Sequence, residues 1–241
     1  MTYCVAMKLD AGLVFMSDTR TNAGIDNIST VSKQTSWSVP GERAIFLLSA
    51  GNLATTQAVV SQLDERTKAP GERNQTLLEA PSMFQVAKTV GETLRDTIAE
   101  AANGGPDSAF SATLLLGGQI KGSPPRLFTI YPEGNFIEAS DDNPFFQSGE
   151  TKYGRPILLR AYRRAMPFER AVKLLLVSYD STLRANLSVG MPLDLMTYRT
   201  DSFEPGEARR FEEGDPYFSK VSETWGGALG EALDKLPDFA F

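Results

Sequence analysis

The first twenty residues, MTYCVAMKLDAGLVFMSDTR (1–20), consist of two apolar runs on either side of the turn sequence Asp10–Gly12. A short turn of this kind between two apolar runs predicts a β-hairpin. A hydroxyl residue, Thr2, stands at the tip of the first strand, and a carboxylate, Asp18, closes the second. Because a hairpin brings the start of one strand beside the end of the other, we expect Thr2 and Asp18 to lie close together.

The composition of the 241-residue chain limits the kinds of catalysis and metal binding that are open to it. The chain has no histidine and one cysteine, Cys4. Serine–histidine and cysteine–histidine catalysis are therefore excluded, and so are zinc sites built on histidine or on several cysteines. No residue cluster implies a metal or another cofactor. The net charge of −6 argues against a nucleic-acid or anionic-membrane partner. Without a membrane-length apolar run, a secretory signal or a cysteine pair, we expect a cytoplasmic protein.

The order of elements predicts the fold class. Apolar alternation indicates strands in the first fifty residues, at about 111–140, and at about 191–200 and 207–213. Apolar residues that recur every three or four positions indicate helices from Asn52, from Ser82, at 154–165 and 168–184, and from Asp215 onward. We therefore expect an α+β protein with a single domain, 1–241, folded as a four-layer αββα sandwich. The apolar stripes of all these helices are expected to be core, including the last one, which carries Leu229 and Leu233.

Thr2 suggests the chemistry available to a chain without histidine. If Met1 is removed, Thr2 carries a hydroxyl nucleophile and a free amine, whose ordinary pKa of about 8 suits a base near neutral pH. A nearby ammonium favours both the alkoxide and the neutral amine, and it needs a carboxylate to hold it when buried. Lys33, in the expected strand TVSKQTSWSV (30–39), and Asp18 match these two needs.

The motif T-x(15)-D-x-R-T-N-A-G, followed by a lysine in the next strand and by S-A-G-N at the first helix, resembles proteasome-type β-subunits. These are N-terminal-nucleophile threonine peptidases with the αββα sandwich, and the chain is most similar to the bacterial branch called Anbu (ancestral β-subunit). The likeness covers almost the whole chain. It implies catalytic roles for Thr2, Asp18, Lys33, Gly51, Ser148 and Ser188, and substrate contacts from Asn22 and Ser49.

Two departures from the family pattern bear on this interpretation. Lys33 stands one position short of the usual spacing from Thr2. When the sequence is aligned with the family motif so that Ser148 and Ser188 match its serines, Ala185 falls where proteasome families have an aspartate. Asn186 and Asp180 are the polar neighbours that could take its place.

The leading functional hypothesis is a self-assembling threonine peptidase that cleaves peptide or protein substrates through Thr2. The resemblance implies rings or open spirals of identical subunits. The sequence contains no recognisable docking motif for an ATPase. A second hypothesis keeps the site but changes the substrate to a small or unusual amide. A third, favoured by Ala185, is a ring-forming scaffold with little catalysis.

Overall fold

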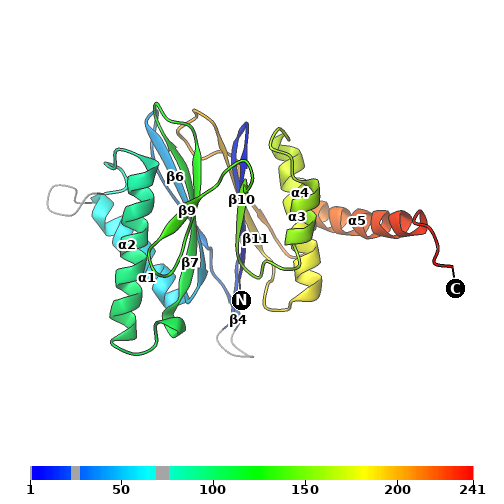
Figure 1. The fold of residues 1–241 in the computed structure, drawn as a ribbon, viewed down its shortest axis with the longest axis horizontal. Helices are drawn as coiled ribbons and strands as arrows, with labels where there is room; N and C mark the ends of the chain where they lie inside the picture. The colour runs from blue at the N-terminus through cyan, green and yellow to red at the C-terminus, as the bar shows by residue number, and fades with distance from the viewer. Residues whose placement is uncertain (1, 23–27, 69–75, 241) are drawn as a thin grey trace.

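The computed structural model describes residues 2–22, 28–68 and 76–240, and its centre is a pair of antiparallel β-sheets stacked face to face (Figure 1). The first sheet has the strand order β10-β1-β2-β11-β12, and the second has the order β5-β6-β7-β8-β9. The strands of the first sheet are β1 (Tyr3–Leu9), β2 (Gly12–Asp18), β10 (Phe145–Gly149), β11 (Leu193–Arg199) and β12 (Ala208–Phe211). Those of the second are β5 (Gln34–Val39), β6 (Arg43–Gly51), β7 (Ala112–Ile120), β8 (Arg126–Ile130) and β9 (Phe136–Glu138).

The predicted hairpin is confirmed and forms the centre of the first sheet. Cys4 pairs with Ser17 and Leu9 with Gly12, so the start of β1 lies beside the end of β2. Gly12 has φ +145°, and a Cβ there would overlap the carbonyl of Tyr198 on the adjacent strand β11. Only glycine fits this turn without strain. The turn therefore fixes the register that brings Thr2 and Asp18 together.

Both faces of β1 and β2 are buried, because the first sheet is sandwiched between the second sheet and a helical layer. Side chains such as Cys4, Ala6 and Phe15 face the other sheet. Tyr3 and Val5 point the opposite way, toward the helices. Alternation along a strand thus places Cys4 in the interface between the sheets and Tyr3 beneath the helices.

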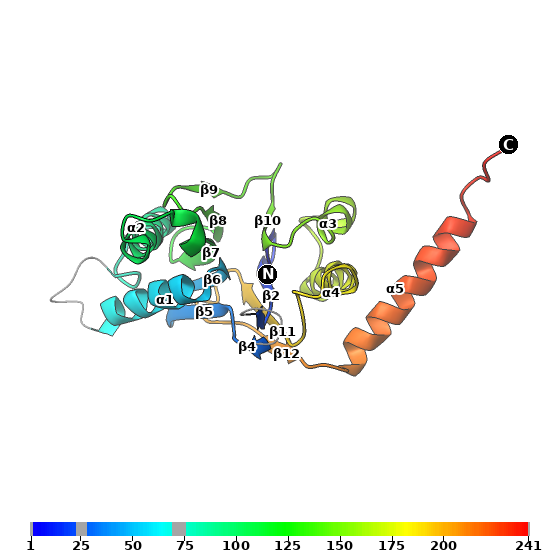
Figure 2. The ribbon, with the colours of Figure 1, turned by 90° about the horizontal axis from the view of Figure 1, so that it is seen from below.

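A helix pair covers the outer face of each sheet, which completes the αββα order (Figure 2). The predicted fold class is therefore confirmed. The first sheet is covered by α3 (Arg155–Ala161) and α4 (Phe168–Ala185), and the second by α1 (Leu53–Lys68) and α2 (Met83–Ala102). The boundaries of α2 follow from its sequence. Ser82 caps its start by accepting a hydrogen bond from the N–H of Gln85, and Asn103 ends it in a left-handed conformation.

The last helix, α5 (Pro216–Asp234), differs from the expectation. Its predicted start is correct, because Asp215 caps it through the N–H groups of Tyr217 and Phe218. Its apolar stripe, however, is core only at its start: Phe218 and Val221 pack against the core in partly buried positions, no residue of α5 is fully buried, and the helix projects away from the sandwich (Figure 2). Leu229 and Leu233 are 50% and 68% exposed. Amphipathic periodicity reveals an apolar face but not the surface that covers it.

Three smaller differences concern the segments around the site. The expected strand 30–39 begins only at Gln34, so Lys33 lies in the extended segment just before β5. The polar stretch after Asp18 forms a small two-stranded sheet of β3 (Arg20–Asn22) and β4 (Ile28–Thr30), which periodicity did not predict. Strand β10 was also missed, because its five residues FFQSG are too short for a clear alternation. Among the described residues, no helix has the length and apolarity needed to cross a bilayer.

Candidate functional site

Thr2 lies immediately before β1 and lines a cavity of about 340 Å³ at one end of the sandwich. The cavity lies between the strand ends and α1. Residues predicted for the site that line it together with Thr2 are Lys33, Ser49 and Gly51. Further polar lining comes from Thr21, Ser32, Thr35, Thr56, Gln57 and Ser61. The structure thus brings a hydroxyl, an ammonium and a strand-end glycine to one hollow.

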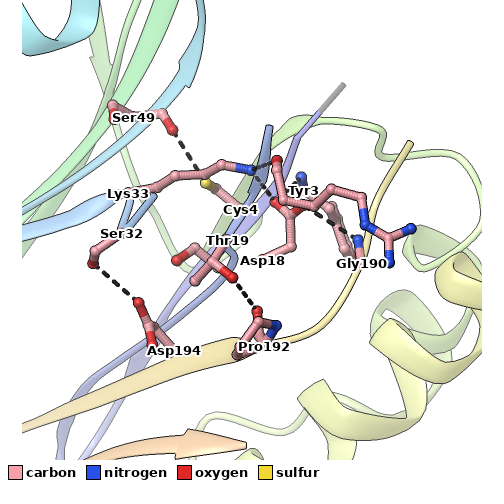
Figure 3. Close-up of polar contacts among 12 residues, drawn as sticks. Tyr3, Cys4, Asp18, Thr19, Ser32, Lys33, Ser49, Gly190, Pro192 and Asp194 are labelled. Atoms are coloured by element: carbon pink, nitrogen blue, oxygen red, sulfur yellow. Dashed lines mark hydrogen bonds and ion pairs between the residues drawn. The ribbon is translucent and has the colours of Figure 1, made fainter. Parts of the chain in front are cut away.

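Asp18 and Lys33 form a buried ion pair beside this cavity (Figure 3). Lys33 Nζ lies 2.6 Å from Asp18 Oδ1 and also donates to the carbonyl oxygen of Arg20 at 2.8 Å. The N–H of Tyr3, the residue after Thr2, donates to the same Asp18 oxygen at 3.0 Å. The ammonium is therefore held against the first residues of β1, as the hypothesis requires.

The backbone of Lys33 is fixed although it lies outside the regular strand. Its carbonyl oxygen accepts a hydrogen bond from the N–H of Ser49 at 3.0 Å, which extends the pairing of β5 with β6. The N–H of Val31 donates to the carbonyl oxygen of Thr19 in the segment between β2 and β3. Two elements therefore aim the side chain of Lys33 at Asp18.

Burial raises the pKa of the Asp18 carboxyl, while the Lys33 ammonium and the N–H groups of Tyr3 and Gly190 oppose that rise. Asp18 is fully buried and Lys33 is 7% exposed. An isolated charge in such a place would be strongly destabilising, so each group depends on the other. The pair can therefore keep a positive charge near the Thr2 hydroxyl, where it favours the alkoxide.

The main chain of Thr2 is clamped to strand β10. The N–H of Glu150 donates to the Thr2 carbonyl oxygen at 2.7 Å. Gly149 has φ +83°, and a Cβ at that position would overlap the Thr2 carbonyl. This close approach requires glycine in the Gln147–Ser148–Gly149 motif.

Gly51 ends β6 at the point where the chain enters α1. It has φ +125°, and a Cβ there would crowd the backbone of Ser111 and Ala112 on the neighbouring chain segment. The first N–H groups of a helix lack intrahelical partners and can bind a developing negative charge. A backbone glycine that lines the Thr2 cavity at such a junction suits the predicted oxyanion role.

The two serines expected at the site, Ser148 and Ser188, lie in different surroundings. Ser148 is buried opposite Cys4 in the β1–β10 pairing and lines a second cavity, of about 350 Å³, rather than the one that holds Thr2. Ser188 is half-buried in the turn after α4, with its N–H donating to Asn186 Oδ1 at 2.9 Å. Ser148 lies near the start of β1, and neither serine lines the Thr2 cavity. Met1 and the side chain of Asn22 fall outside the described residues.

Ala185 is exposed at the end of α4, and its two polar neighbours have separate partners. Asp180 accepts a hydrogen bond from Ser222 on α5 at 2.6 Å and pairs with Arg184. Asn186 instead donates to the buried carboxylate of Glu150 at 2.8 Å. The sequence interpretation missed Glu150 because a glutamate after a turn glycine usually lies on the surface.

Arg20 is a further residue near the site whose setting the sequence alone did not reveal. Its guanidinium donates to the carbonyl oxygen of Leu187 at 2.9 Å and covers Gly190, where a Cβ would overlap it. The Gly190 N–H lies 3.4 Å from Asp18 Oδ2. The turn 187–190 is thereby held against the ion pair.

Among the described residues, no group of three or more histidine, cysteine, aspartate or glutamate side chains gathers as a metal site would. The site consists instead of a hydroxyl, a buried ammonium–carboxylate pair and backbone groups. Such an arrangement can activate an alcohol for attack on a carbonyl, provided that a base accepts its proton.

Comparisons with known proteins show which family the chain belongs to. A sequence model described as "Proteasome subunit" matches residues 2–190. Two of the similar solved structures are the Anbu (Gly-1) mutant from Hyphomicrobium sp. strain MC1, at 50% identity over 100% of both chains with a TM-score of 0.93, and Anbu (ancestral beta-subunit) from Yersinia bercovieri, at 48% identity over 99% of both chains with a TM-score of 0.93.

A third similar structure is the helical assembly of the Anbu complex from Pseudomonas aeruginosa. It is 47% identical over 99% of this chain and 98% of that chain, with a TM-score of 0.90. A search of curated proteins found no match. The family match spans more than half of the chain, and these structures span nearly all of it. The chain belongs to the proteasome subunit family, and within that family its relatives are the Anbu proteins.

Proposed function

We propose that the protein is a threonine peptidase in which Thr2, exposed by removal of Met1, acts as nucleophile and base. The Thr2 hydroxyl oxygen attacks the carbonyl carbon of a peptide bond while its proton passes to the Thr2 amine. The N–H of Gly51 stabilises the oxyanion. The tetrahedral intermediate collapses, the leaving amine takes the proton, and the acyl group remains as an ester on Thr2. Water then hydrolyses the ester and regenerates the hydroxyl.

The observation that carries this proposal is the buried Lys33–Asp18 pair beside Thr2. Lysine is seldom buried without a specific need, and here its ammonium lies next to the one residue that can supply both a hydroxyl and an α-amine. The cavity of about 340 Å³ has the size of a side-chain pocket. Because Ser49 lines it, we assign it to the acyl side of the substrate, with Asn22 contacting the substrate backbone.

Thr2→Ala tests this proposal directly. The variant keeps the free amine but has no hydroxyl, so turnover of a susceptible substrate is expected to fall by about 10³-fold or more. Thr2→Ser keeps both groups and should retain measurable activity. A panel of fluorogenic peptides and small amides, assayed with protein whose mass shows that Met1 is absent, measures both variants. Equal activity in Thr2→Ala and the unchanged protein would refute the peptidase and the small-amide hypothesis alike.

We further propose that identical subunits assemble in the cytoplasm through the projecting helix α5. Its leucines at 229 and 233 are 50% and 68% exposed, and Leu236, just beyond the helix, is 63% exposed, which is unusual for an apolar stripe of this length. A stripe of this kind is stabilised by a partner surface rather than by water. The related Pseudomonas aeruginosa structure, described as a helical assembly, supports self-association.

Replacing Leu229 and Leu233 together by lysine is expected to shift the particle toward smaller species, because two charges would enter an apolar contact. Mass photometry at nanomolar concentration measures the change. Glu231→Lys, on the same helix, is the matched control for added charge. An unchanged mass distribution for the double variant would show that α5 does not hold the assembly.

A further inference from the structure

Glu150 is a buried carboxylate whose ion pair is long and is made to an exposed side chain. The residue is 5% exposed. Its Oε2 accepts a hydrogen bond from Asn186 Nδ2 at 2.8 Å, which is a neutral donor. Its ion-pair partner, Lys152 Nζ, is 3.8 Å from Oε1 and belongs to a side chain that is 72% exposed. Burying a carboxylate with so little compensation is unfavourable unless another positive group faces it.

The position of Glu150 relative to Thr2 suggests what that group is. Gly149 pairs with Tyr3, so Glu150 stands next to Thr2 at the start of β1, and its N–H donates to the Thr2 carbonyl oxygen. The nitrogen and the carbonyl oxygen of one residue are only about 3 Å apart, because three bonds join them. The Thr2 amine therefore forms about 3 Å from the oxygen that the backbone of Glu150 contacts, so the two residues are direct neighbours across the strands.

Asn186 couples this carboxylate to the turn that carries Ser188. Its amide nitrogen donates to Glu150, and its amide oxygen accepts the N–H of Ser188 at 2.9 Å. Its own N–H is fixed by the Thr182 carbonyl at the end of α4. Both ends of the amide are thus used, so its orientation is determined. One side chain bridges the chain next to Thr2 and the turn after Ala185.

We propose that Glu150, oriented by Asn186, is a positioning residue that supplies the negative charge facing the Thr2 amine, in place of a carboxylate at position 185. This inference rests on the proposed function. The carboxylate favours the ammonium form, and the Lys33 ammonium favours the neutral amine. The balance holds the amine in place and keeps it able to accept a proton. Among the described residues, the other charged groups on the elements around this end of the sheet include Asp18, Arg20, Lys33, Lys152, Arg155, Asp180 and Asp194.

The test is a measurement of the amine itself, without turnover. Protein that begins at Thr2 is labelled with a trace of an acylating reagent across a pH series, and the fraction labelled at Thr2 is read by mass spectrometry. Glu150→Gln removes the charge but keeps the shape, so the midpoint of labelling should move to lower pH by about half a unit or more. Glu133→Gln, at the exposed turn between β8 and β9, is the control and should leave the midpoint unchanged.

Two further variants extend the test, and the first of them does not depend on how Glu150→Gln folds. Asn186→Ala releases the carboxylate toward Lys152, and it too should lower the midpoint. Adding Ala185→Asp to Glu150→Gln returns a charge from the end of α4 and should move the midpoint back up. The pH at which kcat/KM rises should shift among these variants in the same order as the labelling midpoint. A merely structural role would not produce this order.

Unchanged midpoints in Glu150→Gln and Asn186→Ala would overturn the inference. This outcome is distinguishable from failure of the proposed function. If the midpoints shift while no substrate is hydrolysed through Thr2, the peptidase proposal fails and Glu150 still faces the amine. If hydrolysis depends on Thr2 while the midpoints stay in place, only the role of Glu150 is refuted.

Discussion

Replacing Lys33 by methionine is expected to abolish Thr2-dependent hydrolysis and to lower the free energy of unfolding by about 3–5 kcal/mol. Methionine fills similar space but carries no charge, so Asp18 is left buried with only backbone N–H donors. The hydroxyl of Thr2 loses the neighbouring ammonium at the same time. Urea unfolding at pH 7 and turnover of a peptide substrate measure the two effects.

Two controls separate the lost charge pair from a general packing defect. Adding Asp18→Asn to Lys33→Met removes the orphaned charge, and we expect it to recover about half or more of the lost stability while activity stays absent. A double variant as unstable as Lys33→Met would contradict the account, because the penalty would then not be the unpaired carboxylate.

The stability of Lys33→Met should also rise as the pH is lowered. Burial raises the pKa of Asp18 above its usual range, and losing the ammonium removes the main opposing effect. A group whose folded pKa exceeds its unfolded value, about 3.9 for aspartate, stabilises the fold below that value and loses this contribution as pH rises through the folded pKa. The variant should therefore be more stable near pH 4 than at pH 7, relative to the unchanged protein. A flat difference across this range would refute the assignment.

Gly149→Ala is expected to be the most damaging glycine substitution at the site, with a loss of about 3 kcal/mol or more and no measurable hydrolysis. The backbone at this position has φ +83°, and the added methyl group would overlap the Thr2 carbonyl. Strand β10 would have to separate from β1 where it clamps Thr2. Thermal unfolding and substrate turnover measure the result.

Gly122→Ala is the matched control. Gly122 has φ +85°, nearly the same conformation, but nothing lies within 4 Å of the position that a Cβ would occupy. Its substitution should cost only the conformational strain of about 1 kcal/mol and leave hydrolysis intact. Equal losses at the two glycines would show that strain, rather than the contact with Thr2, decides the effect.

The sequence predicted those parts of the fold that depend on local pattern. The hairpin around Gly12, the four covering helices and the cap at Asp215 are set by turn chemistry, periodicity and capping residues. The strand β10 was not predicted, because five residues give too few alternations. The exposed face of α5 was not predicted either, because an exposed apolar stripe and a stripe facing the core have the same period.

The candidate site divides in a similar way. The hairpin predicted that Thr2 and Asp18 would meet, and Lys33 completes the ion pair although it precedes β5 rather than lying within it. Glu150 could not be predicted from the chain alone. Its burial results from pairing of β10 with β1 and from the reach of Asn186, two contacts between segments far apart in sequence.

The central claim is that one residue supplies both the attacking oxygen and the proton acceptor. A peptide epoxyketone tests it most directly, because its ketone reacts with the Thr2 hydroxyl and its epoxide with the Thr2 amine. Tandem mass spectrometry of the reacted protein should find the inhibitor joined to the terminal peptide through both Thr2 atoms, and no adduct in Thr2→Ala. An adduct of equal yield in Thr2→Ala, or a reactive protein that retains Met1, would contradict the account.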